Sequence, residues 1–510
     1  MKRRLFLLVL PVAAFIAGSQ LVAQQEPVDR AVVARIQAEA SQHSRVLEMF
    51  NYITNVTGGR LTGSRAHKQA ADYLRDRLAE FGMTNPHLES FPFDRGGWEL
   101  QKFTLELTAP RYYPMYGFPA AWSTSTKGVL EGTPIYIGDK TAVEIEALGE
   151  KLRGAIVLMS PPQTVFTSVD RLDPTVSGQP AGTMPPTVGT PARQVQPRAA
   201  GNDLSTLLRR FGAGAVLRPS AGKDDTIFIG AATGGEDAVP QVTVVTEHYN
   251  MILRMMQTGV VPRLRLEVRA AFEPADKISY NVIADIPGED PVLKNEIVLL
   301  GAHLDSWHAA TGATDNADGA AAASEAMRIL KTIGVHPRRT IRLAIWSGEE
   351  VGFLGGKAYV DQHLKDQASR DAIAVYLNDD PGTGATVGWF MANNDASKKI
   401  LDSWVDQLKD LGVRKNTMDA YFSSEDGVFD AVGIPAFTTI QDYTNYDVRL
   451  HHTNTDFYEA ISEQDLKQSA TVLATFAYQA AMRNEKFPRR PAGVPANPNQ
   501  PQGRGGRGAR

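Results

Sequence analysis

The stretch GAHLDSWHAATGATDNADG, residues 301–319, holds the densest group of side chains that could bind a metal ion or move a proton. His303 and Asp305 lie two residues apart, and Asp315 follows on a Gly- and Ala-rich loop between an apolar run and an expected helix. Imidazole and carboxylate groups at this spacing suit a metal site, whereas a polar turn that caps a helix would use the same residue types. The remaining sequence favours the metal site.

Carboxylates and imidazoles also follow three later apolar runs that we expect to be strands. They are Glu349 and Glu350 after TIRLAIWSG, Asp379 and Asp380 after AIAVYLN, and His451 and His452 after GIPAFTTIQDYTNYDVRL. Functional sites of open α/β sheets form at the carboxyl ends of the strands, so these groups should converge. Because carboxylates at one edge repel one another, such a cluster calls for a cation.

The converging groups match a site for two metal ions. Two zinc ions that share one carboxylate need about five protein ligands, and their other positions bind water and substrate. The sequence supplies His303, Asp315, Glu350, Asp380 and one of the pair His451 and His452. Glu349 is then free to act as a base. The chain has no cysteine, so any metal must be held by nitrogen and oxygen ligands.

The order of expected elements predicts an α/β fold. Residues 28–85 have apolar side chains at helical spacing, and from about residue 278 continuous apolar runs alternate with helical stretches. We therefore expect a three-layer arrangement, a mostly parallel sheet flanked by helices. Residues 111–270 contain short β-rich runs and a Pro-, Thr- and Gly-rich stretch at about 161–200, which predicts a small inserted domain with a long loop.

The two ends of the chain differ from the rest. Residues 1–23 combine a basic start, an apolar run and a small-residue cleavage site, which predicts a signal peptide and an exported protein, periplasmic or extracellular. No later run is long and apolar enough to suggest a stable membrane span after cleavage. The Pro-, Gly- and Arg-rich tail, residues 488–510, is expected to be disordered. A net charge of −4 argues against nucleic-acid binding.

Six motifs across about residues 278–482 resemble the co-catalytic dinuclear zinc exopeptidases, a family that includes secreted bacterial aminopeptidases, carboxypeptidase Q and glutamate carboxypeptidase. The motifs are GAHLDSW, GATDNADG, WSGEEVGFLGG, NDDPG, GIPAF and HHTNTDF. HLDSW is most similar to the carboxypeptidase Q branch. Within residues 111–270, LRGAIVLMS, FGAGAVL and VPQVTVV resemble the protease-associated domain of that family. The resemblance implies a zinc exopeptidase fold whose catalytic domain is formed by residues 24–110 and 271–487.

The resemblance also implies a role for each residue of the cluster. The implied metal ligands are His303 and Asp380 for one zinc ion, Glu350 and His452 for the other, and Asp315 as the bridge. Glu349 would be the general base, and Asp305 would fix the tautomer of His303. In this family the peptide bond that follows the bridging aspartate is often cis, and the bond between Asp315 and Asn316 occupies that place here.

The family pattern also decides between neighbouring residues. It places the histidine ligand four residues before an aspartate, here Asp456, which favours His452 over His451. It reads Asn-x-Asp where this chain has residues 378–380, which favours Asp380 over Asp379. The chain departs from the family at residues 424–426, which read Ser-Glu-Asp where many members have Ser-Asp-His. This departure concerns a substrate contact and leaves the metal ligands intact.

The function implied is hydrolysis of a terminal peptide bond by a zinc-activated water, and we expect an aminopeptidase or dipeptidase acting on small peptides. A carboxypeptidase is the alternative, with Arg449 as one option for binding a substrate carboxylate. A receptor-like binding protein and a one-zinc aminoacyl cyclase share the fold, but the complete ligand set argues against both. Tyr443, Tyr446 and His308 are candidate substrate contacts that ordinary loop packing explains as well. The sequence does not predict the oligomeric state.

Overall fold

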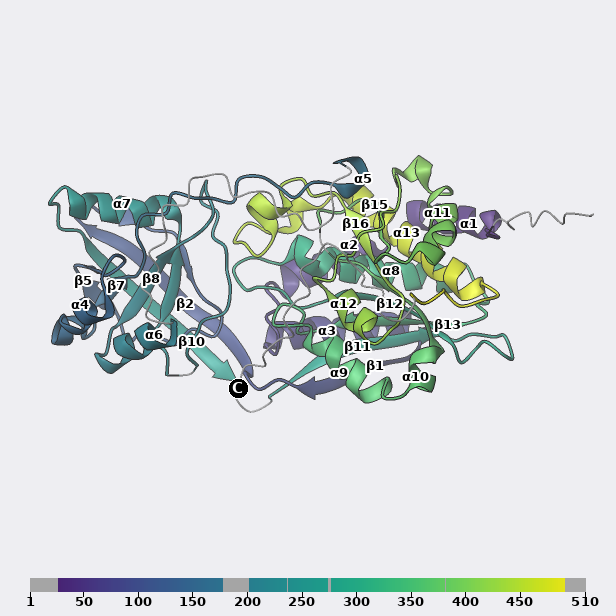
Figure 1. The fold of residues 1–510 in the computed structure, drawn as a ribbon, viewed down its shortest axis with the longest axis horizontal. Coiled ribbons are helices and arrows are strands. Elements are labelled where there is room, and N and C mark those ends of the chain that lie inside the picture. Colours follow the sequence, from purple (N-terminus) through teal and green to yellow (C-terminus); the bar gives the residue numbers. More distant parts are fainter. Residues whose placement is uncertain (1–25, 178–200, 236, 274–276, 381, 491–510) are drawn as a thin grey trace, which may run out of the picture.

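The computed structural model describes residues 26–177, 201–235, 237–273, 277–380 and 382–490. The signal peptide expected at residues 1–23, most of the loop expected at 161–200 and nearly all of the tail expected at 488–510 lie outside these ranges. Within them, no helix is long and apolar enough to cross a membrane. The described strands form three sheets, of seven, four and five strands (Figure 1).

The seven-stranded sheet carries the predicted site residues. Its strands, in spatial order, are β1 (Thr84–Pro92), β11 (Ile278–Ile286), β13 (Thr340–Trp346), β12 (Ile297–His303), β14 (Ile373–Asn378), β16 (Ala436–Gln441) and β15 (Thr386–Phe390). The four strands β13, β12, β14 and β16 run parallel to one another, and β1, β11 and β15 join them by antiparallel pairs. The α/β class is confirmed, but the sheet is mixed rather than mostly parallel. A continuous apolar run indicates burial on both faces and does not encode the direction of the neighbouring strand.

Helices cover both faces of this sheet. One face packs against α1 (Arg30–Gln42), α2 (Val46–Asn51), α3 (Arg65–Glu80), α8 (Asp318–Thr332), α11 (Lys398–Val405) and α13 (Glu463–Met482). The other packs against α9 (Leu354–His363) and α12 (Glu425–Ala431), with α10 (Gln367–Ala372) leading into β14. β12 illustrates the layering, since Val298 and Leu300 enter the first core and Leu299 the second. Side chains buried on both faces hold the strand ends in fixed positions.

The remaining sheets form a β-rich part, residues 97–273, which lies at the left of Figure 1. Its four-stranded sheet is β3 (Tyr113–Pro114), β2 (Gly97–Ala109), β10 (Arg263–Glu273) and β5 (Leu130–Gly132). Its five-stranded sheet is β4 (Gly117–Pro119), β9 (Gln241–Val244), β8 (Ala215–Pro219), β7 (Ile156–Leu158) and β6 (Ile135–Tyr136). The helices here are α4 (Ala142–Glu146), α6 (Gly201–Arg210) and α7 (Thr246–Gln257), whereas α5 (Pro174–Ser177), which falls in the same range of sequence, lies beside β15 (Figure 1).

The long antiparallel pair of β2 and β10 connects the β-rich part to the rest of the chain. β2 falls within residues 24–110, which the sequence assigns to the N-terminal part of the catalytic domain, yet it pairs with β10 and β3 rather than with the seven-stranded sheet. The alternating pattern of residues 98–108 predicts a strand without naming its partner. The domain limits at residues 110 and 270 therefore stay a proposal.

Candidate metal centre

The predicted site residues stand at one edge of the seven-stranded sheet, where its central strands end. His303 is the last residue of β12, Asp315 lies on the helical turn η3 (Ala313–Ala317) before α8, and Glu349 and Glu350 follow β13. Asp379 and Asp380 follow β14, and the histidine pair follows β16 through the turn η6 (Tyr446–Leu450). Parallel strands bring their carboxyl ends to one side, so four distant segments of sequence meet here.

Asp315 lies between two imidazole rings. Its Oδ1 atom is 3.3 Å from Nε2 of His303, and its Oδ2 atom is 3.3 Å from Nε2 of His452. Asp380 approaches the same nitrogen of His303, with its Oδ1 atom at 3.5 Å. Glu350 Oε2 lies 2.9 Å from Nε2 of His452. Two clusters of possible ligand atoms thus share one carboxylate. The peptide bond between Asp315 and Asn316 is cis.

In each pair of adjacent candidate ligands, one residue lies closer to the other possible ligands than its neighbour does. His452 is nearer than His451 to Asp315, since Nε2 of His451 lies 4.0 Å from the Asp315 carboxylate, and the contact with Glu350 is made by His452. Both histidines nevertheless lie close enough to Asp315 to join one cluster of possible ligands.

Asp379 is occupied elsewhere. Its Oδ1 atom accepts hydrogen bonds from Thr439 at 2.5 Å and from the side-chain amide of Gln441 at 3.0 Å, both on β16. Burial raises the pKa of Asp379 to about 6. The adjacent carboxylate, Asp380, is the one that faces His303.

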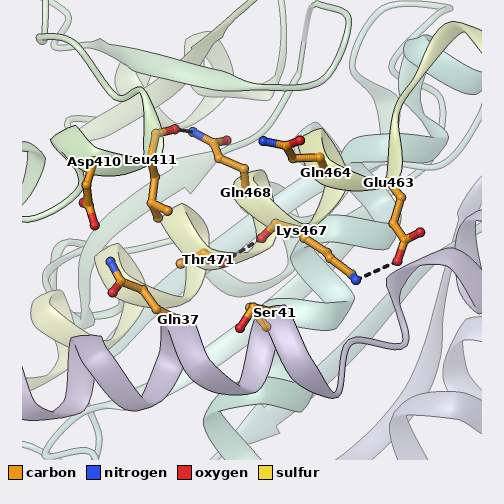
Figure 2. A pocket seen from close by; sticks show the side chains of 10 residues that line it. Gln37, Ser41, Asp410, Leu411, Glu463, Gln464, Lys467, Gln468 and Thr471 are labelled. Atoms are coloured by element: carbon orange, nitrogen blue, oxygen red, sulfur yellow. Dashed lines mark hydrogen bonds and ion pairs between the residues drawn. The ribbon is translucent and has the colours of Figure 1, made fainter.

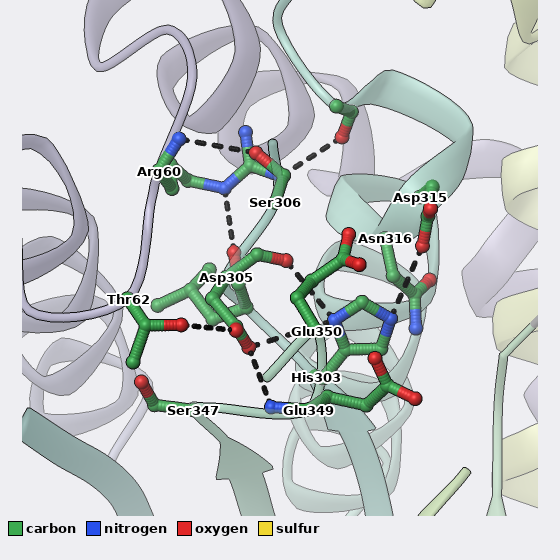
Figure 3. A network of polar contacts seen from close by, with 12 residues as sticks. Arg60, Thr62, His303, Asp305, Ser306, Asp315, Asn316, Ser347, Glu349 and Glu350 are labelled. Carbon is green, nitrogen blue, oxygen red and sulfur yellow. Dashed lines mark hydrogen bonds and ion pairs between the residues drawn. The ribbon is translucent and has the colours of Figure 1, made fainter. Parts of the chain in front are cut away.

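Asp305 supports His303 and Glu349 in different ways (Figure 3). Nδ1 of His303 lies 3.0 Å from the backbone carbonyl of Asp305, so it donates there and leaves Nε2 with a free lone pair. The Asp305 carboxylate is farther from this ring, at 3.7 Å. It accepts instead from the backbone N–H of Glu349 at 3.2 Å and from the hydroxyl of Thr62 at 2.6 Å. The backbone of Asp305 therefore selects the tautomer, and its side chain holds the start of the Glu349 segment.

Glu349 is the candidate base. Among the described residues its carboxylate has no hydrogen-bond donor, although it lies near His303, Asp380 and Glu350. Burial, together with the repulsion of nearby carboxylates, raises its pKa well above the usual value. A carboxylate that is unengaged and more basic than usual is suited to accept a proton.

The charges and unpaired atoms of the cluster fit a bound cation. Among the described residues, Nε2 of His303, Oδ2 of Asp315 and both carboxylate oxygens of Glu350 are buried and form no contact with the geometry of a hydrogen bond, although Glu350 Oε2 lies 2.9 Å from Nε2 of His452. Burial and the neighbouring Asp315 raise the pKa of Glu350 to about 7. Burial opposes charge on His452, yet Glu350 raises the pKa of that ring to about 9. These nitrogen and oxygen donors, with no thiolate, suit zinc.

Arg60 and Thr62 belong to this network, although no motif or spacing pattern in the sequence indicates them. Arg60 is fully buried and donates to five backbone carbonyls, among them Leu304 at 2.7 Å and Gly312 at 2.8 Å (Figure 3). Burial lowers its pKa to about 10. A Cβ at Gly59 would lie 2.7 Å from the Cα atom of His308, so a glycine is needed for this close approach. The segment fastens the loop that follows His303.

The loop with the histidine pair is held from the β-rich part. The backbone N–H of Ile229 donates to the carbonyl of His452 at 2.8 Å. On another side, Arg171 forms a bidentate ion pair with the buried Asp447 of η6, with a shortest contact of 2.6 Å. Residues from outside the seven-stranded sheet thus fix this half of the centre.

The candidate substrate contacts named from the sequence are mostly engaged in packing or hydrogen bonds near the metal centre. Tyr443 and Tyr446 are buried under the guanidinium of Arg171, the hydroxyl of Tyr443 has no partner among the described residues, and Tyr446 stacks on His451 with ring centroids 5.0 Å apart. His308 packs edge-on against Trp98, and its Nε2 contacts the carbonyl of Pro119 at 2.9 Å. Arg449 is exposed, and its carbonyl accepts hydrogen bonds from Thr453 and Thr455.

The segment that departs from the family pattern is buried beside the centre. Ser424 accepts from the side-chain amide of Asn378 at 3.0 Å, and Glu425 and Asp426 are at most 1% exposed. Burial raises the pKa of Glu425 to about 8 and that of Asp426 to about 7. Raised pKa values mean that these two buried carboxyl groups resist ionisation unless a nearby cation stabilises the charged form.

Two cavities lie in very different surroundings. One, of about 730 Å³, lies between α1, α13 and the turn η5 (Lys409–Leu411), and polar side chains such as Gln37 and Gln468 line it (Figure 2). The predicted metal ligands, all of them described residues, do not line it. The other cavity, of about 350 Å³, is lined in part by Glu350 and Trp307. Its position makes it the cavity relevant to the metal centre.

Known proteins with similar sequences and folds are peptidases. Residues 281–477 match the model of peptidase family M28. The chain is similar to carboxypeptidase Q of Mus musculus, with 25% identity over 474 residues that cover 92% of each chain. It is also similar in fold to an M28 peptidase precursor from Shewanella amazonensis, with a TM-score of 0.66 and 23% identity over 91% of this chain and 99% of that one. A zinc aminopeptidase from Bacillus subtilis gives a TM-score of 0.57 and 19% identity over 90% and 97% of the two chains. The matched segment and these relatives, together with the donor set at the centre, identify the chain as a metallo-exopeptidase whose residues 281–477 match the model of peptidase family M28.

Proposed function

We propose that this chain is an exported exopeptidase with two zinc ions, acting on small peptides as an aminopeptidase or dipeptidase. The observation that carries the proposal is the position of Asp315, whose two oxygens lie 3.3 Å from Nε2 of His303 and 3.3 Å from Nε2 of His452. A carboxylate between two imidazoles can be shared by two ions, each completed by one further carboxylate. The likeness to a zinc aminopeptidase supports zinc as the metal.

In this proposal His303 and Asp380 hold one ion, Glu350 and His452 hold the other, and Asp315 belongs to both. Zinc bound here would lower the pKa of a water molecule toward neutrality and polarise the carbonyl of the bond to be cleaved.

The chain's own residues handle the proton. Glu349 accepts a proton from the attacking water and delivers it to the nitrogen of the leaving amine. Asp305 keeps that base in place through the hydrogen bond to its backbone N–H, and keeps Nε2 of His303 available. The buried hydroxyl of Tyr443, which has no partner among the described residues, is a candidate donor to the developing oxyanion.

The domain organisation completes the proposal. Residues 1–23 act as a signal peptide that directs export to the periplasm or the medium, and residues 488–510 form a tail. Residues 24–110 and 271–487 form the catalytic domain, and residues 111–270 form an insert of the protease-associated type. The separate sheets of the β-rich part support an inserted unit.

The first test replaces the base and leaves the metal ligands. We expect Glu349→Gln to retain about two zinc ions per chain by elemental analysis and to lose about 10²- to 10⁴-fold in kcat on small peptides. Glu80→Gln, an exposed change on α3, is the matched control and should retain full activity. Substantial activity in Glu349→Gln, or a folded wild-type chain that binds no zinc, would contradict the proposal.

A carboxypeptidase is the second candidate, because the likeness to carboxypeptidase Q extends over 92% of each chain. Amino-terminal amides, N-blocked peptides and free dipeptides distinguish the alternatives. An aminopeptidase cleaves the first group, a carboxypeptidase cleaves the second, and a strict dipeptidase cleaves only the third.

A further inference from the structure

The pocket of about 350 Å³ beside Glu350 has an apolar wall and a charged rim. Trp307 and Leu354 line it from the catalytic side, and Ala231 lines it from the β-rich part. Asp94 and Arg95 lie at its exposed rim, in the segment that leads into β2. An apolar pocket that reaches a metal-ligand candidate is suited to hold a side chain next to the bond that is cleaved.

A row of aromatic rings extends from the metal centre to Arg95. The ring of Trp307 lies 5.8 Å from that of His452, and the ring of Trp122 lies 6.5 Å from that of Trp307. The guanidinium of Arg95 lies 5.0 Å from the centroid of Trp122. Trp122 is itself held by a hydrogen bond from its indole N–H to the carbonyl of Gly96 at 3.0 Å. The cation at the rim therefore has a defined position relative to the centre.

The donors of Arg95 are free to bind an anion. Over the ranges of chain that the structure describes, Arg95 forms no ion pair and no hydrogen bond, whereas Arg171 and Arg342 are both engaged by carboxylates. A cation–π contact holds a guanidinium over a ring without using its five N–H donors. Those donors match a carboxylate group in geometry.

The charge distribution favours one orientation of a peptide. The inner end of the pocket is formed by Glu350, a proposed zinc ligand, so the bond that is cleaved would lie at this end. The outer end presents the unpaired guanidinium. A peptide therefore places its anionic end outward, and the wall of Trp307 and Leu354 accepts an apolar side chain between the two ends.

We propose that Arg95 binds the free C-terminal carboxylate of the substrate, and that the pocket holds an apolar C-terminal residue. This inference rests on the proposed peptidase function and specifies its substrate class, which is short peptides with an unblocked C-terminus. Arg95 is then a specificity-determining residue, outside the segment matched by the family model.

The test compares the dipeptide Leu-Leu with its C-terminal amide. We expect wild-type kcat/KM to be at least about tenfold higher for the free acid, because a charge-assisted bidentate hydrogen bond contributes about that factor or more. In Arg95→Gln the preference falls to about onefold, because kcat/KM for the free acid decreases. Arg111→Gln is the matched control, because Arg111 lies over Tyr113 at 5.2 Å on the β-rich part and away from this pocket. An unchanged preference in Arg95→Gln overturns the inference.

A binding measurement separates this inference from the proposed function. Leu-Leu and its amide are titrated by calorimetry into zinc-loaded Glu349→Gln, with and without Arg95→Gln. Tighter binding of the acid that disappears with Arg95→Gln supports the role of Arg95 even if the wild type cleaves neither peptide, a result that would contradict only the peptidase proposal. Equal binding of the two peptides to Glu349→Gln overturns the role of Arg95 whatever the rates are.

Discussion

Asp305 accepts hydrogen bonds through both carboxylate oxygens, from the Thr62 hydroxyl at 2.6 Å and from the Glu349 backbone at 3.2 Å. It is fully buried, so each donor offsets part of the cost of removing this charge from water. Thr62 therefore acts on the candidate base through Asp305, without touching the substrate.

Replacement of Thr62 tests this arrangement. Thr62→Val keeps the shape and removes the hydroxyl, so we expect the free energy of unfolding to fall by about 1–3 kcal/mol. We also expect kcat to fall while KM changes little, because Glu349 loses part of its support and the substrate pocket is intact. Urea unfolding and initial rates on Leu-Leu measure the two effects.

The control removes a buried hydroxyl elsewhere. Thr475 on α13 is fully buried, and its hydroxyl has no partner among the described residues, so Thr475→Val should leave stability nearly unchanged and kcat at the wild-type value. If Thr62→Val behaved like Thr475→Val, Thr62 would have no positioning role.

Residue types and spacing were sufficient to nominate His303, Asp315 and Glu350 as candidate ligands, because His303 and Glu350 stand at the ends of apolar runs and Asp315 lies on the loop after the first of these runs. They were not sufficient for Arg60 and Thr62. The contact from Thr62 to Asp305 joins residues 243 positions apart, and no local pattern encodes a partner at that separation. The choice of Asp380 over Asp379 came from the family pattern, and the structure adds a physical basis in the bonds that β16 makes to Asp379.

At the scale of elements, the alternation of apolar runs and helical stretches predicted the central strands and the edge where they end. It did not predict the antiparallel placement of β1, β11 and β15. Pairing direction depends on how the chain returns to the sheet, and here β11 returns after the whole β-rich part. Hydrophobic periodicity predicts which side chains are buried, but it does not predict the direction in which a strand pairs with its neighbour.

Arg171 links a segment that precedes α5 to η6. The ion pair with Asp447 is buried, with side-chain exposures of 9% and 1%, and the guanidinium also lies 5.1 Å from the ring of Tyr446. Since Tyr446 stacks on His451, the ion pair of Arg171 and Asp447 helps to hold the loop with the histidine pair in place.

Loss of Arg171 should affect both stability and metal retention. Arg171→Gln leaves the buried carboxylate of Asp447 without its cation, which should lower the free energy of unfolding by about 3–5 kcal/mol. We also expect weaker zinc binding in a competition with a chelator, because the histidine loop is less well held.

Two further variants make this prediction specific. Asp447→Asn in the Arg171→Gln background removes the unpaired charge and should recover part of the stability. Arg153→Gln removes an exposed pair with Glu150, for which the expected loss is small. Normal zinc retention in Arg171→Gln would show that the pair serves stability alone.

At the scale of the whole molecule, His67 on α3 should contribute to sensitivity to acid. The ring is 1% exposed, and neither nitrogen has a partner among the described residues. Burial lowers its pKa from 6.5 to about 4. The unfolded chain therefore binds a proton before the folded chain does, and stability falls as the pH drops from 6.5 to about 4, with no effect above that window.

His67→Leu removes this titration and suits an apolar site. We expect the difference in unfolding free energy between variant and wild type to shift in favour of the variant between pH 6.5 and 4, by on the order of 2–3 kcal/mol. Urea unfolding at several pH values measures it. His43→Leu, a change at an exposed position, should leave the wild-type pH profile intact, and parallel profiles for His67→Leu and wild type would exclude the effect.

The chain enters the β-rich part through β2 and leaves it through β10, and these strands are antiparallel neighbours. The two ends meet, since the backbone N–H of Phe93 donates to the carbonyl of Lys277 at 2.8 Å, and β1 pairs directly with β11. In genetic terms, residues 97–273 are therefore a cassette, a continuous segment that a single deletion could remove. A short turn could then join β1 directly to β11 in the main sheet. In chemical terms they are inseparable from it, because Ile229 and Arg171 hold the histidine loop. A lineage that lost the cassette would keep its strand order and would have to rebuild the support of the loop that carries His452.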